Sequence, residues 1–294
     1  MFDHFEERLV STARGDVYAR IGGDGPPVLL LHGYPQTHLA WHAAAPLLAR
    51  SCRVVVVDLP GYGRSFRPVP APDHRPHSKR ALAADLGQVM TALGHERFAV
   101  AGHDRGGRVG YRMALDAPDR VAALAVLDVV PTGDVWARAD ADLALLYWHW
   151  SFLAQPAPLP ERLIGADPDA FFDLHVRALG LGRREGRYPP ALLAAYRAVL
   201  DDPTVVEAIC EDYRAGAGVD RADDDADAGR TIACPVLALW SASGALPRLY
   251  GDVLDVWRPW TTDLRGEALD TSHFLVDDDP EGVARRITDL VAPR

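Results

Sequence analysis

The residues in this sequence best suited to chemistry lie in the stretch GHDRGGR at residues 102–108. The apolar run 98–101 before it predicts a buried parallel strand, and the amphipathic segment 109–117 after it predicts a helix. Small residues on both sides of Asp104 allow a sharp strand-to-helix turn that displays a reactive side chain. A carboxylate at this turn favours nucleophilic attack by Asp104, although an aspartate that only caps the helix would give the same pattern.

An attacking carboxylate requires two further groups. Asp104 would form an ester, whose hydrolysis needs a base to activate water and an acid partner to orient that base. His273 follows the last predicted strand in a polar turn, the chain position expected for the base, although single histidines are often structural. The strand at 121–127 ends in Asp128, whereas the strand at 235–240 ends without a carboxylate. We therefore assign the acid role to Asp128, the alternative being a helix-capping or salt-bridged aspartate.

Two arginines, Arg105 and Arg108, begin the helix after Asp104. Cations there face the positive end of the helix dipole, which disfavours each by some tenths of a kcal/mol to about 1 kcal/mol. Because they project from one face beside free helix N–H groups, they make an anion site. We expect them to hold a substrate carboxylate beside Asp104 and to keep Asp104 ionised. The alternative, surface arginines paired with acidic neighbours, fits Arg112 better than these two.

The elements that must position these residues alternate between short buried strands and helices. A hairpin is expected at 7–21. Further strands are expected at 28–31, 53–57, 98–101, 121–127 and 235–240, and helices at 79–93, 109–117 and 287–291. This alternation predicts an α/β fold, with a mostly parallel central sheet flanked by helices.

Residues 134–225 interrupt the alternation. They contain helix-like segments rich in alanine, leucine and aromatic residues, separated by prolines, and no buried strand is expected there. We predict a helical cap at 134–225, inserted between two parts of one core at 1–133 and 226–294. The acidic run 220–225 is expected to form a solvated boundary.

Composition and charge exclude several classes of protein. A net charge of −10 over 294 residues argues against nucleic acid or an anionic membrane as partner. Cys52, Cys210 and Cys234 are widely spaced and predict neither a disulfide framework nor a metal cluster. No apolar run approaches the roughly 18 residues of a membrane span, and the acidic N-terminus is not a signal peptide, so a cytoplasmic protein is expected. Lys79 is the only lysine, which we interpret as a composition bias.

Five segments together resemble the α/β-hydrolase superfamily and, within it, the haloacetate dehalogenases of the fluoroacetate dehalogenase type. They are HGYPQ at 32–36, DLPGYGRS at 58–65, GHDRGGR at 102–108, YWHW at 147–150 and SHF at 272–274. The resemblance covers essentially the whole chain. It implies an α/β-hydrolase fold with a helical cap, and hydrolytic dehalogenation of fluoroacetate or chloroacetate to glycolate and halide. A small anionic haloacid as substrate, no cofactor, no metal and a homodimer are expected with it.

The resemblance also implies roles for residues outside the elbow. His149, Trp150 and Tyr213 each offer an N–H or O–H donor, and their positions match the halide pocket of the family. Without the family, aromatic residues in a helical insertion are more often core than site. The backbone N–H groups of Tyr34 and Arg105 are candidates for the oxyanion hole.

Three positions depart from the pattern of the resembled family and bear on substrate preference. Tyr34 stands where phenylalanine is usual, Ser151 where an aromatic residue is usual, and Ser272 where glycine is common. Ser151 would widen or wet the pocket.

Three other functions would share parts of this pattern. An epoxide hydrolase would use Asp104, His273 and an acid, but with two cap tyrosines and without the need for paired arginines. A haloalkane dehalogenase would more typically carry tryptophan at position 105. A ligand-binding member of the fold without activity would not need an intact nucleophile, base and acid.

Overall fold

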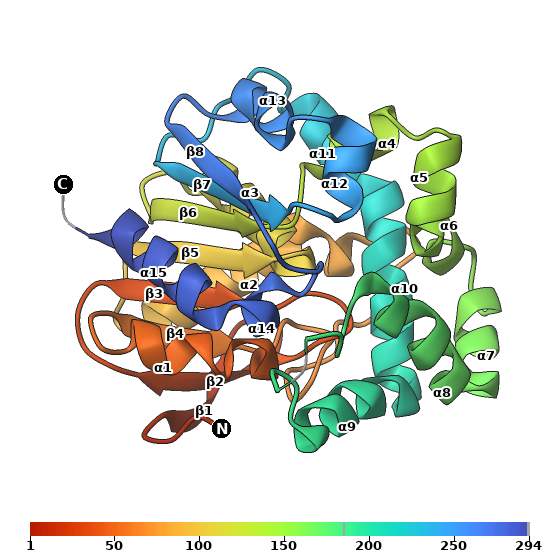
Figure 1. Ribbon diagram of the computed structural model, residues 1–294, viewed down its shortest axis with the longest axis horizontal. Coiled ribbons are helices and arrows are strands. Elements are labelled where there is room, and N and C mark those ends of the chain that lie inside the picture. Colours follow the sequence, from red (N-terminus) through yellow and green to blue (C-terminus); the bar gives the residue numbers. More distant parts are fainter. Residues whose placement is uncertain (185, 293–294) are drawn as a thin grey trace.

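The computed structural model describes residues 1–184 and 186–292 and contains one eight-stranded sheet in the order β1-β2-β4-β3-β5-β6-β7-β8 (Figure 1). The strands are β1 (Glu6–Ser11), β2 (Asp16–Gly22), β3 (Pro27–Leu31), β4 (Arg53–Val57), β5 (Phe98–His103), β6 (Val121–Leu127), β7 (Val236–Ser241) and β8 (Leu264–Leu269). The β1–β2 and β2–β4 pairs are antiparallel and the other five pairs are parallel. The predicted fold class, an α/β fold with a mostly parallel sheet, is confirmed.

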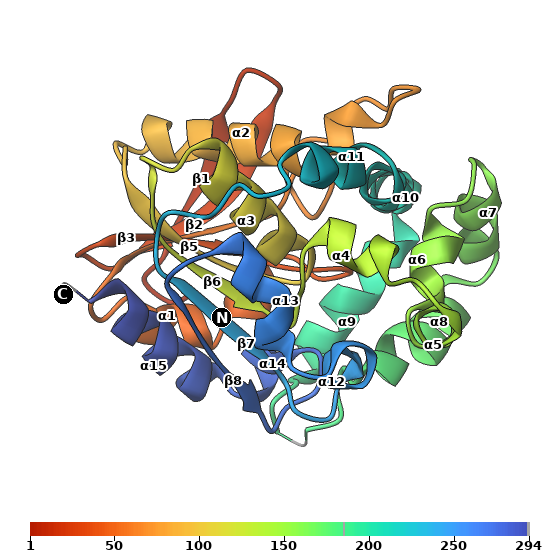
Figure 2. The same cartoon turned by 90° about the horizontal axis from the view of Figure 1, so that it is seen from above.

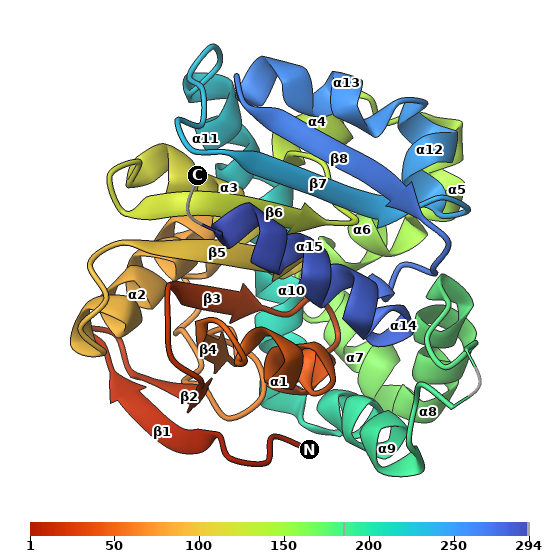
Figure 3. The ribbon, with the colours of Figure 1, turned by 60° about the vertical axis from the view of Figure 1, so that its left-hand side comes forward.

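Helices cover both faces of this sheet (Figure 2). They are α1 (Ala44–Leu48), α2 (Lys79–Ala92), α3 (Arg105–Asp116), α12 (Ala245–Tyr250), α13 (Val253–Trp257), α14 (Leu275–Asp278) and α15 (Pro280–Val291), with the 3-10 turns η1 (His38–Trp41), η2 (Arg75–His77) and η6 (Arg258–Trp260). Figure 3 shows α15 crossing one face of the strands, with α1 beside it. The helix after Asp104 begins at Arg105, four residues earlier than the amphipathic pattern predicts.

The alternation of apolar side chains along each strand divides the core into two layers. In β3, Val28 and Leu30 belong to the cluster that contains Leu48 of α1 and Ile287 of α15. The intervening residues of the strand belong to the other cluster, which contains the apolar residues of α2 and α3. Because side chains point alternately to the two faces, an unbroken apolar run is the pattern required of a strand covered on both.

A second group of helices lies between β6 and β7, and the residues described there form no strand. The group comprises α4 (Thr132–Ala137), α5 (Ala141–Leu146), α6 (Trp148–Leu153), α7 (Leu159–Ala166), α8 (Pro168–Phe171), η3 (Phe172–Val176), η4 (Arg177–Leu179), α9 (Pro190–Ala198), η5 (Val199–Asp201), α10 (Pro203–Ala217) and α11 (Val219–Ala226). Figure 1 shows α5–α10 beyond the carboxyl ends of β5 and β6, the edge where parallel sheets bind ligands. A domain division at 134 and 225 stays a prediction. Within the described ranges no helix is long and apolar enough to cross a membrane.

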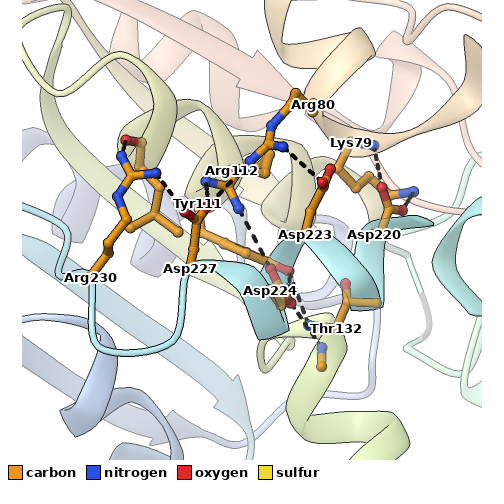
Figure 4. A network of polar contacts seen from close by, with 12 residues as sticks. Lys79, Arg80, Tyr111, Arg112, Thr132, Asp220, Asp223, Asp224, Asp227 and Arg230 are labelled. Carbon is orange, nitrogen blue, oxygen red and sulfur yellow. Dashed lines mark hydrogen bonds and ion pairs between the residues drawn. The ribbon is translucent and has the colours of Figure 1, made fainter. Parts of the chain in front are cut away.

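The acidic run 220–225 is not the solvated boundary that the sequence suggests. Asp220, Asp223 and Asp224 in α11 are buried against the core helices (Figure 4). Asp224 accepts hydrogen bonds from the Tyr111 hydroxyl at 2.8 Å and the Gly133 N–H at 2.8 Å. The run is therefore an interface between α11 and the core, because buried carboxylates require charged or hydrogen-bonded partners.

Arginines from the core helices supply further partners in this network (Figure 4). Arg80 of α2 donates to Asp223 at 2.7 Å, and Arg112 of α3 donates to Asp227 at 2.5 Å. Arg112 is buried rather than at the surface, although it does pair with acidic neighbours, Asp116 among them at 2.7 Å.

A buried carboxylic acid joins the helix after His273 to the second group of helices. Asp277 of α14 accepts from the Gln36 side-chain amide at 2.7 Å and from the Tyr196 hydroxyl of α9 at 3.2 Å. Burial raises the pKa of Asp277 to about 8, because the hydrogen bonds from Gln36 and Tyr196 only partly offset the loss of hydration. Asp277 is therefore largely protonated in the folded protein at neutral pH.

We expect Asp277→Asn to make the protein more stable relative to wild type as the pH rises. The folded state keeps a proton that the unfolded chain releases near its ordinary pKa, so stability present at low pH is lost as the pH rises from about 4 to about 8. The amide stays neutral; its oxygen accepts from Gln36, and its NH2 group can donate to the Tyr196 hydroxyl oxygen. Urea unfolding at about pH 5 and about pH 8 measures the difference. Equal pH dependence in wild type, in Asp277→Asn and in the exposed control Asp142→Asn would contradict a neutral Asp277.

Candidate active site

The turn between β5 and α3 holds Asp104 in a strained backbone conformation, with φ 44° and ψ −113°. A Cβ atom at position 102 would lie 2.3 Å from the Gly106 carbonyl oxygen, and one at position 106 would lie 2.5 Å from the His32 carbonyl oxygen. Only glycine fits at both places, so the two glycines permit the turn that raises Asp104 above the sheet edge. This is the sharp strand-to-helix turn that the sequence predicts around Asp104.

Asp104 is surrounded by groups that favour its charged form. Its Oδ2 atom accepts a hydrogen bond from the Tyr34 backbone N–H at 3.0 Å. Burial raises the pKa of Asp104, but the charges of His273, Arg105 and Arg108 lower it by a larger amount. The net pKa lies below the ordinary value. Asp104 is therefore a carboxylate at neutral pH, which a nucleophile must be.

His273 lies across the same cavity, directly paired with Asp128. The His273 Nδ1 atom is 2.7 Å from Asp128 Oδ2, and the other oxygen of Asp128 accepts from the Ser241 N–H at 2.9 Å. Burial lowers the pKa of His273, whereas the hydrogen bond and charge of Asp128 raise it, and the net pKa is above the ordinary value. An Nδ1–H donated to Asp128 leaves Nε2 as the basic nitrogen of the ring.

A cavity of about 470 Å³ joins these groups to residues of the second group of helices. Besides Asp104, six of the predicted site residues line it, namely Tyr34, Arg108, Asp128, His149, Trp150 and His273. The cavity is lined by Tyr34, Asp104, Arg108, Asp128, Leu146, Tyr147, His149, Trp150, Ala178, Leu179, Arg183, Arg184, Ser241, Ser243, Gly244, Ala245, Arg248, Asp270, Thr271, Ser272, His273 and Asp278. No cluster of three or more metal-ligating side chains occurs in the part of the chain that the structure describes.

The two predicted anion-binding arginines differ in their surroundings. Arg108 lines the cavity, and its Nη1 atom donates to the neutral acceptors Val130 O at 2.8 Å and Thr132 Oγ1 at 3.2 Å. Arg105 does not line the cavity, and its Nε atom donates to Asp212 Oδ2 at 2.7 Å. Arg105 thus pairs with an acidic residue, as the alternative interpretation has it, but it is buried rather than at the surface. Arg105 is 1% exposed, and the Asp212 carboxylate offsets the loss of hydration of its charge.

The three predicted cap donors lie together on α6 and α10. His149 and Trp150 line the cavity, and the Tyr213 ring lies behind them, 5.8 Å from His149 and 5.9 Å from Trp150 between centroids. The guanidinium groups of Arg105 and Arg108 lie 5.6 Å and 4.5 Å from the Trp150 ring. Burial holds the pKa of His149 well below its ordinary value, so this ring is neutral and has a single N–H to donate.

Two residues of the site carry no sequence signal that assigns them a role. His103, inside the elbow, has its Nε2 atom 2.8 Å from the His273 carbonyl oxygen. Burial lowers the pKa of His103 to about 4, so the neutral ring donates this hydrogen bond and fixes the backbone of His273. The other is Asp212, one position before Tyr213. Its partner Arg105 is 107 residues away, which no local pattern reveals.

Comparison with known proteins places this geometry in a family. Residues 26–280 match the sequence model of the alpha/beta hydrolase fold family. A fluoroacetate dehalogenase from a Burkholderia species is 44% identical over 292 residues, which are 99% of this chain and 95% of that protein. A soluble epoxide hydrolase from Corynebacterium sp. (strain C12) is 29% identical over 92% of both chains.

A solved structure from Nostoc sp PCC 7120, described as an alpha/beta hydrolase, has a TM-score of 0.96 and 44% identity and covers 100% of both chains. The resemblance predicted from the five sequence segments is thus confirmed across the whole chain. This protein belongs to the α/β-hydrolase fold family, in the group of its fluoroacetate dehalogenase relative.

Proposed function

We propose that this protein hydrolyses the carbon–halogen bond of haloacetates and releases glycolate and halide. The observation that carries the proposal is an ionised, buried carboxylate at the elbow, Asp104, with two buried guanidinium groups beside it. Such a site selects an anion that also carries an electrophilic carbon. The relative named fluoroacetate dehalogenase, at 44% identity, supports the same reaction class.

In the first step, Asp104 attacks the carbon that bears the halogen. The Tyr34 N–H holds Oδ2, so Oδ1 is the attacking oxygen, and the halide leaves with the bonding electron pair. Arg108 on the cavity wall and Arg105, whose guanidinium carbon lies 5.6 Å from the Trp150 ring of that wall, hold the substrate carboxylate and align the carbon–halogen bond with the nucleophile. Donors from the cap, foremost the Trp150 indole N–H, stabilise the charge that develops on the halogen.

In the second step, water hydrolyses the ester on Asp104. His273 Nε2 takes a proton from water, and the resulting hydroxide attacks the carboxyl carbon of Asp104. Negative charge develops on Oδ2, where the backbone N–H groups of Tyr34 and Arg105 stabilise it. Collapse of this intermediate expels the glycolate oxygen, which takes the proton from His273 Nε2, and the carboxylic acid left on Asp104 loses its proton to solvent to restore the carboxylate. Asp128 stabilises the protonated His273 ring while this happens.

Epoxide hydrolysis is the alternative, supported by the epoxide hydrolase relative and by Tyr147 on the cavity wall. An epoxide carries no carboxylate, so Arg105 and Arg108 would be left without a function. Incubation with fluoroacetate, chloroacetate and styrene oxide distinguishes the two by release of halide or diol. Neither product from any of the three would favour a ligand-binding protein without activity. A cytoplasmic homodimer stays a prediction.

His273→Asn should stop the reaction after the first step. Attack by Asp104 needs no base, but water is then not activated, so the ester accumulates. Mass spectrometry of the intact variant after chloroacetate treatment should show one added glycolyl group, with halide release limited to one equivalent. Asp104→Asn is the matched control and should form no adduct. Absence of both the adduct and the halide burst in His273→Asn would contradict the order of steps.

Asp128→Asn should shift the pH dependence of ester hydrolysis. His273 must be neutral to act as base, and its raised pKa places the loss of activity on acidification above the ordinary histidine range of about 6.5. Without the charge of Asp128, burial lowers the pKa of His273, so this acidic limb moves to lower pH. The maximal rate should also fall by about 10²-fold or more. Decay of the ester after a pulse of chloroacetate, followed across pH, measures the maximal rate and its pH dependence. If the loss of activity on acidification occurs at the same pH in Asp128→Asn as in wild type, the proposed role of Asp128 beside His273 is wrong.

Trp150→Phe should reduce kcat for fluoroacetate more than for chloroacetate. The substitution keeps an aromatic ring beside Arg108 and removes only the indole N–H. Fluoride is the poorer leaving group and gains more from a hydrogen-bond donor, so its release depends more on this contact. Trp148→Phe, at a partly exposed position of the same helix, serves as the control. Equal losses on both acids would make Trp150 a packing residue.

A further inference from the structure

Arg105 is held on two of its three nitrogen atoms by a single residue of the cap. Its Nε atom donates to the Asp212 side chain at 2.7 Å, and its Nη2 atom donates to the Asp212 backbone carbonyl at 2.9 Å. The third nitrogen, Nη1, is buried and has no hydrogen-bond partner among the described residues. The Tyr213 ring lies against the guanidinium plane, 4.2 Å from its carbon to the ring centroid. Asp212 and Tyr213 thus fix the orientation of the Arg105 guanidinium group.

Asp212 is in turn held from the core. The Lys79 ammonium group, at the start of α2, donates to Asp212 Oδ1, and the Tyr62 hydroxyl donates to Oδ2 at 3.2 Å. Burial raises the pKa of Asp212, but Arg105 and Lys79 lower it more strongly, and the net pKa is far below the ordinary value. Asp212 is therefore a carboxylate, and it is paired with both Arg105 and Lys79.

Lys79 occupies a position that would be unfavourable without these partners. It is the first residue of α2, where a cation faces the positive end of the helix dipole, and it is 1% exposed. A second carboxylate, Asp220 of α11, accepts from its Nζ atom at 3.1 Å and from its backbone N–H at 2.7 Å (Figure 4). The chain Asp220–Lys79–Asp212–Arg105 thus alternates between cap helices and core helices, in the order α11, α2, α10 and α3.

We propose that Asp212 and Lys79 are positioning residues for the substrate carboxylate. With Nε and Nη2 of Arg105 engaged, Asp212 leaves Nη1 as the free donor of this guanidinium, and Lys79 fixes Asp212 in the orientation that does so. Arg105 therefore offers the carboxylate one directed hydrogen bond, whereas Arg108, whose Nη1 atom donates to neutral acceptors, supplies charge. The proposal deepens the haloacetate function and rests on it.

The test compares the action of variants on chloroacetate and on chloroacetamide, its neutral counterpart. The carboxylate forms a charge-assisted hydrogen bond with Nη1 of Arg105, whereas the amide oxygen forms only a weaker one, so positioning is read from the ratio of kcat/KM for the two substrates. Asp212→Ala should lower this ratio by about 10²-fold, the loss expected when a reacting group is misplaced by about 1 Å. Asp212→Asn should lower it by about 10-fold, because the amide oxygen still accepts from Nε but carries no charge. Lys79→Met should also lower the ratio.

Asp223→Asn is the matched control, since it removes another buried carboxylate of the same cap–core interface without contacting Arg105. It should leave the ratio unchanged. Equal losses on both substrates in the Asp212 variants, together with a lower unfolding temperature, would show a purely structural residue and overturn the proposal. If Asp212→Ala does not fold, an unchanged ratio in folded Asp212→Asn overturns it equally.

Binding of acetate separates this inference from the proposed function. Acetate is the substrate without its halogen, and its dissociation constant is measurable from the fluorescence of Trp150 and the neighbouring tryptophans in every variant. Weaker acetate binding in Asp212→Asn than in Asp223→Asn supports the positioning role even if wild type releases no halide. Unchanged binding, with an unchanged substrate ratio, refutes it.

Discussion

Asp104 must be charged, buried and open to attack at the same time. Openness comes from the backbone, because only glycine at 102 and 106 allows the turn that raises the carboxylate above the sheet edge. Burial works against the charge and raises the pKa, so cations must gather around the carboxylate. His273 and Arg105 are the strongest of them, and each of these needs an anion of its own. Much of the polar interior is a consequence of this sequence of compensations.

The compensation is uneven, and the unevenness matters for the chemistry. The charge of Arg105 is balanced by Asp212, whereas the Nη1 atom of Arg108 meets a carbonyl and a hydroxyl. A guanidinium group with neutral partners projects more of its field into the cavity than one paired with a carboxylate. We therefore expect Arg108 to contribute most of the attraction for an anion, and Arg105 to contribute direction.

The grouping of Asp104, Asp128 and His273 could be predicted from the sequence because each residue follows the end of a strand. The position of Asp104 follows from small residues after an apolar run, and Asp128 and His273 follow from chain order. The start of α3 was less clear, since Gly106 and Gly107 interrupt the apolar periodicity on which helix prediction depends. Asp212 and the acidic residues of α11 could not be interpreted, because their partners on α2 and α3 lie more than 100 residues away. A charge run looks the same in sequence whether solvent or arginine neutralises it.

The burial of Lys79 has a practical consequence. It carries the only side-chain amine of the protein, and that amine is enclosed between α2, α10 and α11. Acylating reagents that modify lysine side chains will leave this group untouched while the helices stay in place. Its modification therefore marks molecules in which α10 and α11 have separated from α2. The mass of the peptide that contains Lys79, followed over time in such a reagent, reports how often α10 and α11 separate from α2.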